Sequence, residues 1–165
     1  MEEDLKQLFI KAYDEHSDAL FRHCLFRLSD REKSIDIVQD TFTKTWVYIS
    51  LGKKVGNMRA FLYKTLNNLI IDEYRRKKHI SLDFLNDDGF DPHFEETTTI
   101  EEKLDGSIAL SLLRQLPDQY KDILFMKYVN GLDIAEIAEI TGESSNTIAV
   151  RIHRGINKLR ELFKL

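Results

Sequence analysis

Polar and basic side chains between residues 145 and 157 have types and spacing that suit binding to nucleic acid. Ser144 is a good N-cap residue, so a helix is expected to begin immediately after it. One side of that helix carries Asn146, Val150, His153, Arg154 and Asn157, with Thr147, Ala149 and Arg160 near its edges. Side chains early in a recognition helix reach base edges, and cations further along neutralise phosphates. An ordinary solvated helix face is the alternative interpretation.

A second set of polar side chains follows the spacing of two earlier helices. Asp36, Gln39 and Asp40 share one side of the helix predicted from Ile35 to Ile49 and suit a polar protein interface. The helix predicted from Phe61 to Tyr74 carries Asn67, Asn68, Asp72 and Arg75 and continues into the basic run RRKK at 75–78. A purely structural helix does not require this polar set.

Helices with one apolar face are expected to position these residues. In the N-terminal part, three-and-four spacing predicts helical segments from Leu5 to Arg27, which Ser29 and Asp30 break before the second helix. In the C-terminal part, Pro117 indicates a helix start and Gly131 a helix end. Beyond them, Ala138, Gly142 and Ile148 stand at the offsets of a small crossing residue, a turn residue and a buried aliphatic in a helix-turn-helix.

Composition and charge give the domain organisation. The 165 residues include only 2 prolines and 7 glycines, which favours long helices over turn-rich β-structure. The net charge of −4 divides into +3 for residues 1–78, −8 for residues 79–105 and +1 for residues 106–165. The acidic stretch lacks helical periodicity for most of its length. The sequence therefore predicts an all-α protein of two small helical domains, 1–78 and 106–165, joined by an acidic linker, with a helix-turn-helix in the second.

Several classes of protein are disfavoured by the same sequence. No window approaches the roughly 18 uncharged apolar residues of a membrane span, and the acidic start MEEDLKQLF is unlike a signal peptide, so we expect a cytoplasmic protein without direct membrane insertion. Cys24 is the single cysteine, and the histidines are scattered, which argues against a disulfide or a metal site. Most carboxylates fall in the linker or on solvated faces. We therefore expect no enzyme activity and no cofactor.

Three segments carry a family resemblance: SIDIVQDTFTKTWVYI at 34–49, RAFLYKTLNNLIIDEYRRKK at 59–78, and residues 116–163. The first two resemble region 2 and the third resembles region 4 of the extracytoplasmic-function sigma factors, which belong to the sigma-70 family. The resemblance implies an alternative sigma factor, in which region 2 binds the polymerase clamp and opens the −10 element and region 4 reads the −35 element. The implied partners are core RNA polymerase, through its β′ clamp and β subunits, and promoter DNA. The resemblance also makes an anti-sigma factor a plausible further partner.

The resemblance assigns roles residue by residue. Asp36, Gln39 and Asp40 match family positions that contact the β′ clamp, whereas Phe42 and Trp46 are expected in the core. Asn68 lies near the family's pocket for a flipped −10 base. The full −10 set is Tyr63, Asn67, Asn68, Asp72, Arg75 and Arg76. Tyr63 and Tyr48 could stack on unpaired bases, with structural packing as the alternative. The −35 set is Ser145, Asn146, Thr147, Val150, Arg151, His153, Arg154 and Asn157.

The chain departs from the family at the start of the recognition helix. Many members have a small-Thr-Val-Lys-Ser-Arg run, where this chain has Asn-Thr-Ile-Ala-Val-Arg at 146–151. A lysine is therefore missing, and Val150 offers an apolar surface suited to a thymine methyl. A stand-alone helix-turn-helix regulator remains the alternative function, although it would leave the Asp36–Phe42 pattern unexplained.

Overall fold

A computed structural model of the chain describes residues 1–83 and 106–164, and within those ranges it contains helices and no strand. The expected all-α fold class is therefore confirmed for this part of the chain. Contacts divide the chain into two units, Met1–Glu95 and Glu96–Leu165. Each unit has its own core and is described by itself.

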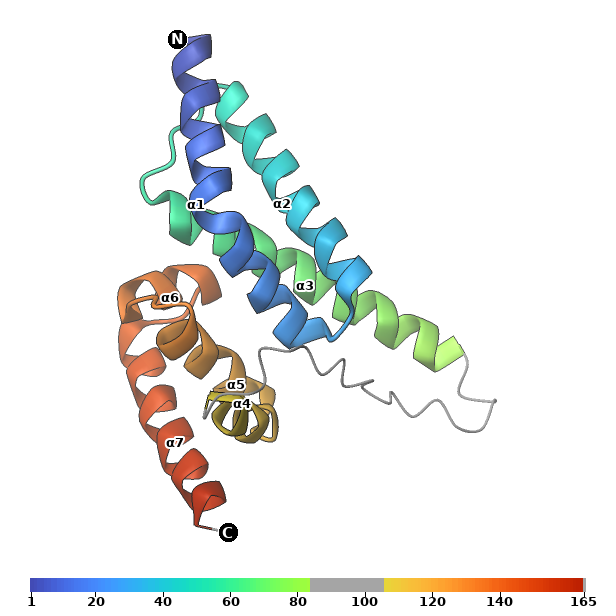
Figure 1. Cartoon of the computed structure of the whole chain (residues 1–165), viewed down its shortest axis with the longest axis vertical. Helices are drawn as coiled ribbons and strands as arrows, with labels where there is room; N and C mark the ends of the chain where they lie inside the picture. The colour runs from blue at the N-terminus through green and yellow to red at the C-terminus, as the bar shows by residue number, and fades with distance from the viewer. Residues whose placement is uncertain (84–105, 165) are drawn as a thin grey trace. The chain divides into compact units, whose positions relative to one another are not determined.

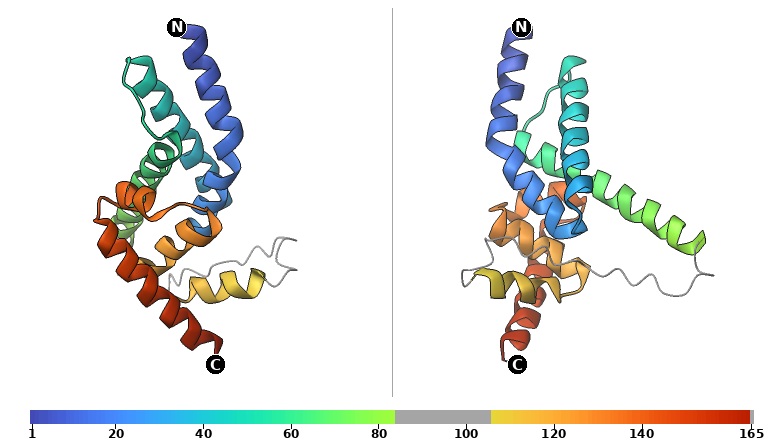
Figure 2. Two further views of the ribbon diagram at one scale, coloured as in Figure 1. Left: turned by 90° about the vertical axis from the view of Figure 1, so that its left-hand side faces the viewer. Right: turned by 45° about the vertical axis from the view of Figure 1, so that its right-hand side comes forward.

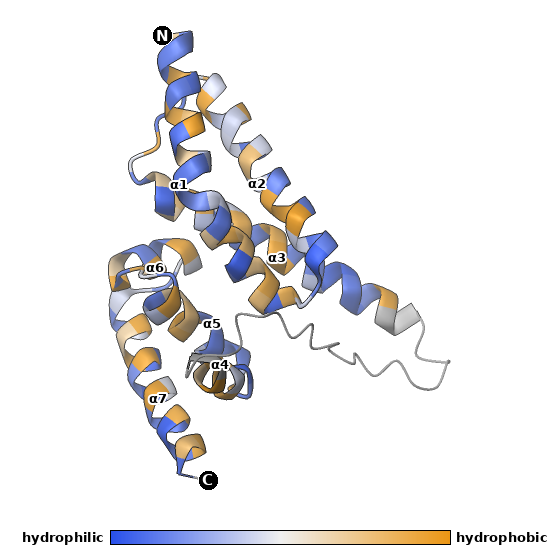
Figure 3. Cartoon of the chain, viewed as in Figure 1, coloured by the Kyte–Doolittle hydropathy of each residue, from blue (hydrophilic) through white to orange (hydrophobic). Residues whose placement is uncertain are grey.

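The first unit consists of three long helices, α1 (Glu2–Leu28), α2 (Arg31–Ser50) and α3 (Met58–Asp83) (Figure 1). Each helix packs against the other two, and α3 crosses the α1–α2 pair (Figure 2). The apolar sides of the helices meet between them (Figure 3). The buried core includes Leu20, Cys24, Phe42, Leu62, Leu66 and Ile70. Burial raises the pKa of the Cys24 thiol to about 11, as expected for an unreactive core cysteine.

The turn between α1 and α2 shows how local sequence ends one helix and begins the next. Ser29 closes α1 in the left-handed conformation, with φ 53°, and its N–H bonds to the carbonyl of Leu25. Asp30 then caps α2, because its side chain accepts a hydrogen bond from the Lys33 N–H at 3.0 Å. The break expected at Ser29 and Asp30 is confirmed.

Helix α3 runs further than the first predicted domain. It extends to Asp83, five residues past Lys78, because no proline or glycine interrupts the sequence between these two residues. The predicted linker 79–105 therefore begins within α3. Its remaining residues, 84–105, lie outside the described residues.

The second unit contains five helical segments: α4 (Gly106–Arg114), α5 (Asp118–Leu124), the π-helical segment η2 (Phe125–Val129), α6 (Ile134–Thr141) and α7 (Ser145–Phe163). Pro117 stands at the N-cap of α5, and Gly131 has φ 69°, so both predicted boundaries are confirmed. Gly155 of α7 is buried against α5, where a Cβ would lie 3.0 Å from Leu124 Cδ1. Glycine thus permits the close approach of α7 and α5.

Candidate functional site

A polar groove lies between α2 and α3 in the first unit. Asp36, Gln39 and Asp40 are exposed on α2, as their helical spacing predicted, and they line this groove of about 450 Å³. The facing residues on α3 are Leu69, Asp72 and Glu73, and Lys33 and Ile37 complete the lining from α2. The groove therefore collects four carboxylates and one ammonium group, which suits a basic protein partner better than a phosphate backbone.

Asp72, which the resemblance assigns to the −10 set, lies on the side of α3 that faces α2. It is exposed, but it lines the groove together with Asp36 and Asp40. A carboxylate in these surroundings repels a phosphate, so its position associates it with the α2 surface. Sequence spacing along α3 could not reveal this, because it gives no information on which side of α3 meets α2.

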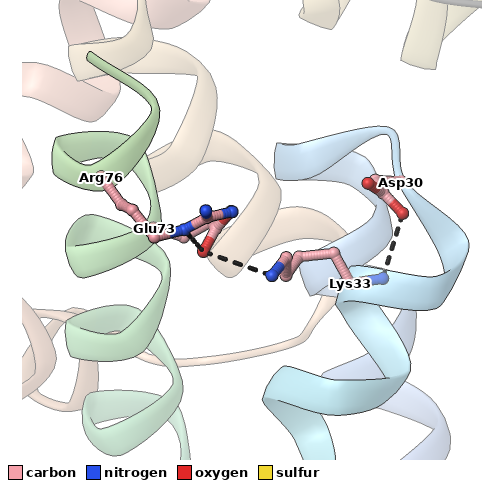
Figure 4. A network of polar contacts seen from close by, with 4 residues as sticks. All are labelled: Asp30, Lys33, Glu73 and Arg76. Atoms are coloured by element: carbon pink, nitrogen blue, oxygen red, sulfur yellow. Dashed lines mark hydrogen bonds and ion pairs between the residues drawn. The ribbon is translucent and has the colours of Figure 1, made fainter. Parts of the chain in front are cut away.

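A network of charges joins the two helices at one end of this groove. The Glu73 carboxylate accepts hydrogen bonds from Arg76 Nη2 at 2.7 Å and from Arg76 Nε at 3.2 Å (Figure 4). Lys33 Nζ of α2 approaches the same carboxylate, 3.7 Å from Oε2. The hydrogen bond from Arg76 holds the pKa of Glu73 below its usual range, against the opposing effect of burial, and Lys33 contributes in the same direction. Glu73 was not among the residues singled out from the sequence.

Two residues of the predicted −10 set belong to the core instead. Tyr63 is 2% exposed and packs edge-on against the His23 ring, with 5.6 Å between ring centroids. Asn67 is 8% exposed, and its Oδ1 accepts a hydrogen bond from Arg27 Nη1 of α1. Neither side chain is accessible to a base in this conformation, which argues against a direct DNA contact by either residue. The physical reason is that α3 contacts two helices and buries a wider face than one apolar stripe.

The rest of the −10 set is accessible. Asn68, Arg75 and Arg76 are exposed on α3, and the basic run continues through the exposed Lys77 and Lys78. The core side of this segment is anchored by Tyr74, whose hydroxyl donates to the Arg27 carbonyl at 2.7 Å. The Arg27 guanidinium also lies over the Tyr74 ring, 5.6 Å from its centroid. These contacts fix the base of the segment that carries the cations.

The aromatic residues of α2 behave in different ways. Phe42 is buried as expected, in edge contact with Phe9 of α1 at 6.0 Å between centroids. Trp46 also packs on Phe9, at 5.2 Å, but keeps 37% of its surface exposed and is only partly a core residue. Tyr48 packs against Phe61 at 4.8 Å, with Lys53 Nζ over its ring at 5.1 Å. Packing thus accounts for the position of Tyr48.

The second unit contains the predicted helix-turn-helix. Asp133 caps α6 in a reciprocal capping box with Glu136, and Gly142 ends α6 with φ 73°. Ser144 caps α7, because its Oγ accepts from the Thr147 N–H at 3.1 Å. Ile148 is fully buried behind the turn. The capping, turn and core roles expected for Ser144, Gly142 and Ile148 are confirmed.

Helix α7 presents most of the predicted −35 set to solvent. The exposed members are Ser145, Asn146, Val150, His153, Arg154 and Asn157. Asn157 Nδ2 lies 3.4 Å from His153 Nε2, so these two side chains are neighbours along the face. Thr147 and Arg151 are only partly exposed and turn back toward the start of the helix. The Thr147 hydroxyl is 2.8 Å from Ser144 Oγ, and Arg151 Nη1 is 2.6 Å from Glu143 Oε2.

Within residues 1–83 and 106–164, no three His, Cys, Asp or Glu side chains come together as metal ligands. No helix in the same ranges is both long and apolar enough to span a membrane.

Comparison with known proteins matches both units to one family. Residues 12–80 match sigma-70 region 2, and residues 107–159 match sigma-70 region 4. The RNA polymerase sigma factor SigV of Bacillus subtilis is 27% identical, over 94% of this chain and 90% of SigV. The ECF RNA polymerase sigma factor SigL of Mycobacterium tuberculosis is 28% identical, over 90% of this chain and 84% of SigL.

Solved structures show the same fold. The chain aligns with a TM-score of 0.75 to the sigma factor RpoE in its complex with the anti-sigma factor NepR from Bartonella quintana, at 23% identity and over 99% of this chain and 98% of that one. CnrH, solved with the cytosolic domain of CnrY, aligns with a TM-score of 0.70 at 21% identity, over 96% and 89% of the two chains. Together the two region matches cover most of the described helices, and this chain belongs to the extracytoplasmic-function group of the sigma-70 family.

Proposed function

We propose that this sigma factor, which directs RNA polymerase to promoters, uses three separate surfaces to bind polymerase, the −10 element and the −35 element. The α2 side of the polar groove binds the β′ clamp, the exposed face of α3 opens the −10 element, and the exposed face of α7 reads the −35 element. The observation that carries this division is the polarity of α3. Its side toward α2 holds carboxylates, and its exposed end holds the run of cations Arg75–Lys78. One helix can thus meet a basic protein surface and an anionic strand at the same time.

Asn68 is the residue of α3 that we assign to the extruded −10 base. Its side chain is exposed one turn before Asp72, whereas its neighbour Asn67 is held in the core. An amide at this position can donate to and accept from the edge of an unpaired base. The flipped base needs no hydrolysis for its capture, so we propose that the subunit has no catalytic activity of its own and needs no cofactor.

The charge distribution favours action within the holoenzyme. Net charges of +3 and +1 on residues 1–78 and 106–165 are small for phosphate binding, and residues 79–105 add −8. We propose that the free protein binds DNA weakly and that polymerase holds both units on one promoter. Two weak contacts then act as a chelate. This role places the protein in the cytoplasm, and the fold shared with NepR-bound RpoE supports an anti-sigma factor as a further partner.

Binding to core polymerase tests the proposal and separates it from a stand-alone helix-turn-helix regulator. The double variant Gln39→Ala/Asp40→Ala should bind core polymerase more weakly, because it removes an amide and a carboxylate from the groove. A matched control removes the same residue types from exposed positions of α1, as Gln7→Ala/Asp14→Ala. Both variants should unfold like the wild type, since exposed polar residues seldom carry much stability. Equal affinity of the two variants for core polymerase contradicts the clamp assignment, and a wild-type chain that does not co-migrate with core polymerase contradicts the function itself.

A further inference from the structure

Glu73 is a buried carboxylate that binds a cation from each of two helices. Glu73 is 8% exposed, and a glutamate is seldom buried to this extent without a partner for its charge. Both oxygens are used: Oε1 accepts from Arg76 Nη2, and Oε2 accepts from Arg76 Nε and lies 3.7 Å from Lys33 Nζ. Figure 4 shows the Arg76 and Lys33 side chains converging on this carboxylate from α3 and α2. A paired, two-point contact of this kind fixes the plane of a guanidinium, which a single contact does not.

The contact leaves part of Arg76 available for another acceptor. A guanidinium has five N–H donors, and the two hydrogen bonds to Glu73 use Nε and Nη2. Nη1 can therefore donate to another group, and 54% of the Arg76 side chain is exposed. The residue stands in the basic run that the proposed function assigns to the −10 strand. A guanidinium already held on one edge loses less conformational freedom when a phosphate binds its other edge.

Lys33 holds the carboxylate from the opposite helix. It lies in the first turn of α2, where its backbone N–H is bonded to the capping side chain of Asp30. The position of its backbone is thereby fixed relative to the start of α2. With two cations on one carboxylate, the group of three side chains keeps a net charge of +1. The hydrogen bonds also keep the pKa of Glu73 below its usual range, so the carboxylate is ionised at neutral pH.

From this geometry we propose that Glu73 is a positioning residue, which orients the Arg76 guanidinium for a phosphate of the promoter strand. The inference rests on the proposed DNA-binding role of α3. It predicts that neutralising Glu73 weakens promoter binding, which is the opposite of what charge alone predicts. A carboxylate near DNA repels phosphates, so its neutralisation should tighten promoter binding if electrostatic repulsion is its only effect. Positioning requires the opposite, because Arg76 then loses its fixed orientation.

A double-mutant cycle in the reconstituted holoenzyme tests the proposal. Promoter affinity and its salt dependence are measured for the wild type, Glu73→Gln, Arg76→Ala and the double variant. Glu73→Gln should weaken binding about two- to tenfold, the range for immobilising one long side chain. The double variant should bind like Arg76→Ala alone. The salt slope should also fall for Glu73→Gln, although this substitution makes the protein less negative.

Two further variants separate positioning from charge and from folding. Glu73→Asp keeps the charge but retracts the carboxylate by one methylene, so it should weaken promoter binding as Glu73→Gln does. In an Arg75→Ala background, Glu73→Gln should have its full effect, since the cations that contact this carboxylate within the described residues are Arg76 and Lys33. Urea unfolding is measured for every variant, which identifies any variant with a damaged fold. Binding to core polymerase is measured separately, because Glu73 also lines the groove assigned to the β′ clamp, and promoter binding is compared at saturating core polymerase.

Three outcomes of these binding measurements would contradict the proposal. Tighter or unchanged promoter binding by Glu73→Gln contradicts positioning. An equal loss with and without Arg76 also contradicts it, because the effect would then be a general one on the fold. If Arg76→Ala itself leaves promoter binding unchanged, Arg76 makes no useful DNA contact, and the proposed role of this part of α3 fails together with the inference.

Discussion

Arg151 of α7 reaches back to Glu143 in the preceding turn, with Nη1 2.6 Å from Oε2. The pair encloses the N-cap Ser144 and joins the second turn of α7 to the residue after Gly142. The resemblance places Arg151 in the −35 set, and in the folded chain its guanidinium is also paired with a carboxylate of this turn. We therefore expect the pair to hold the start of α7 against the turn, and the DNA-reading role of Arg151 stays a prediction.

The first prediction concerns this pair. Glu143→Gln should lower the free energy of unfolding by about 0.5–1 kcal/mol, because both side chains are about one third exposed and solvent screens their attraction. Arg151→Ala in the Glu143→Gln background should cost little more. Urea unfolding of the four proteins measures the coupling. Additive losses of stability would mean that this pair contributes no coupling energy to the fold.

The second prediction concerns the exposed face of α7. Val150→Lys should change which −35 sequences are preferred, because it replaces an apolar contact with a cation at a position that faces outward. Arg154→Ala should weaken all promoters alike and reduce the salt slope by about one, since Arg154 lies far enough along the helix for a phosphate contact. Selection from a randomised −35 library measures both effects. Identical profiles and yields for all three proteins would mean that this face does not touch DNA.

The third prediction concerns Asn68. Asn68→Ala should reduce open-complex formation on duplex promoters more than it reduces binding to core polymerase, because it removes a hydrogen bond to an extruded base. On a template with a pre-melted −10 element and an abasic site at the required base, mutant and wild type should perform equally. A defect that persists in full on that template points to damaged folding. Asn67→Ala is an instructive contrast, because Asn67 bonds to Arg27 and its loss should lower stability.

The fourth prediction concerns the close approach of α7 and α5. Gly155→Ala should destabilise the chain by about 1–2 kcal/mol, because the new Cβ would lie 3.0 Å from Leu124 Cδ1 and 3.2 Å from Tyr120 Cβ. The higher helix propensity of alanine offsets only part of this strain. Gly56→Ala is the control, since no atom lies within 4 Å of a Cβ at that position. Thermal unfolding that is unchanged or improved by Gly155→Ala would show that Leu124 can move aside.

The fifth prediction concerns acid stability. The pKa of Glu73 lies below its unfolded-state value, so its ionised form stabilises the native state above that value. This contribution is lost as the pH falls through the native pKa. Urea unfolding between pH 7 and pH 3 should therefore show a shallower loss of stability for Glu73→Gln than for the wild type. Parallel acid profiles for the two proteins would mean that Glu73 titrates alike in the folded and unfolded chains.

Local signals in the sequence were sufficient for the break between α1 and α2 and for the helix-turn-helix, but not for the end of α3. Asp30, Ser144 and Gly142 act on backbone groups within four residues of themselves, so each could be identified without knowledge of the fold. The outward face of α7 was also predictable, because the buried Ile148 and Ile152 mark its inner side. These features depend on short-range geometry.

The sequence was least informative where contacts join distant parts of the chain. Asn67 bonds to Arg27, 40 residues earlier, and Lys33 meets Glu73 across the same interval. Periodicity puts Asn67 on the buried side of α3, but its polar type gave no sign of a partner in the core. The pairing of Arg151 with Glu143 was missed for a related reason, because the spacing of Arg151 along α7 is that of a surface residue.

The exposed end of α3 has a consequence for the thermodynamics of promoter capture. After Tyr74, every side chain through Ile80 is exposed, so this part of the helix depends on its own backbone hydrogen bonds and on the Glu73–Arg76 contact. Helical turns without tertiary packing open locally and exchange their amide hydrogens faster than a buried core does. A DNA strand that binds Arg75–Lys78 must therefore also suppress this opening. Promoter capture thus carries a loss of conformational entropy, concentrated in the few turns that hold the cations.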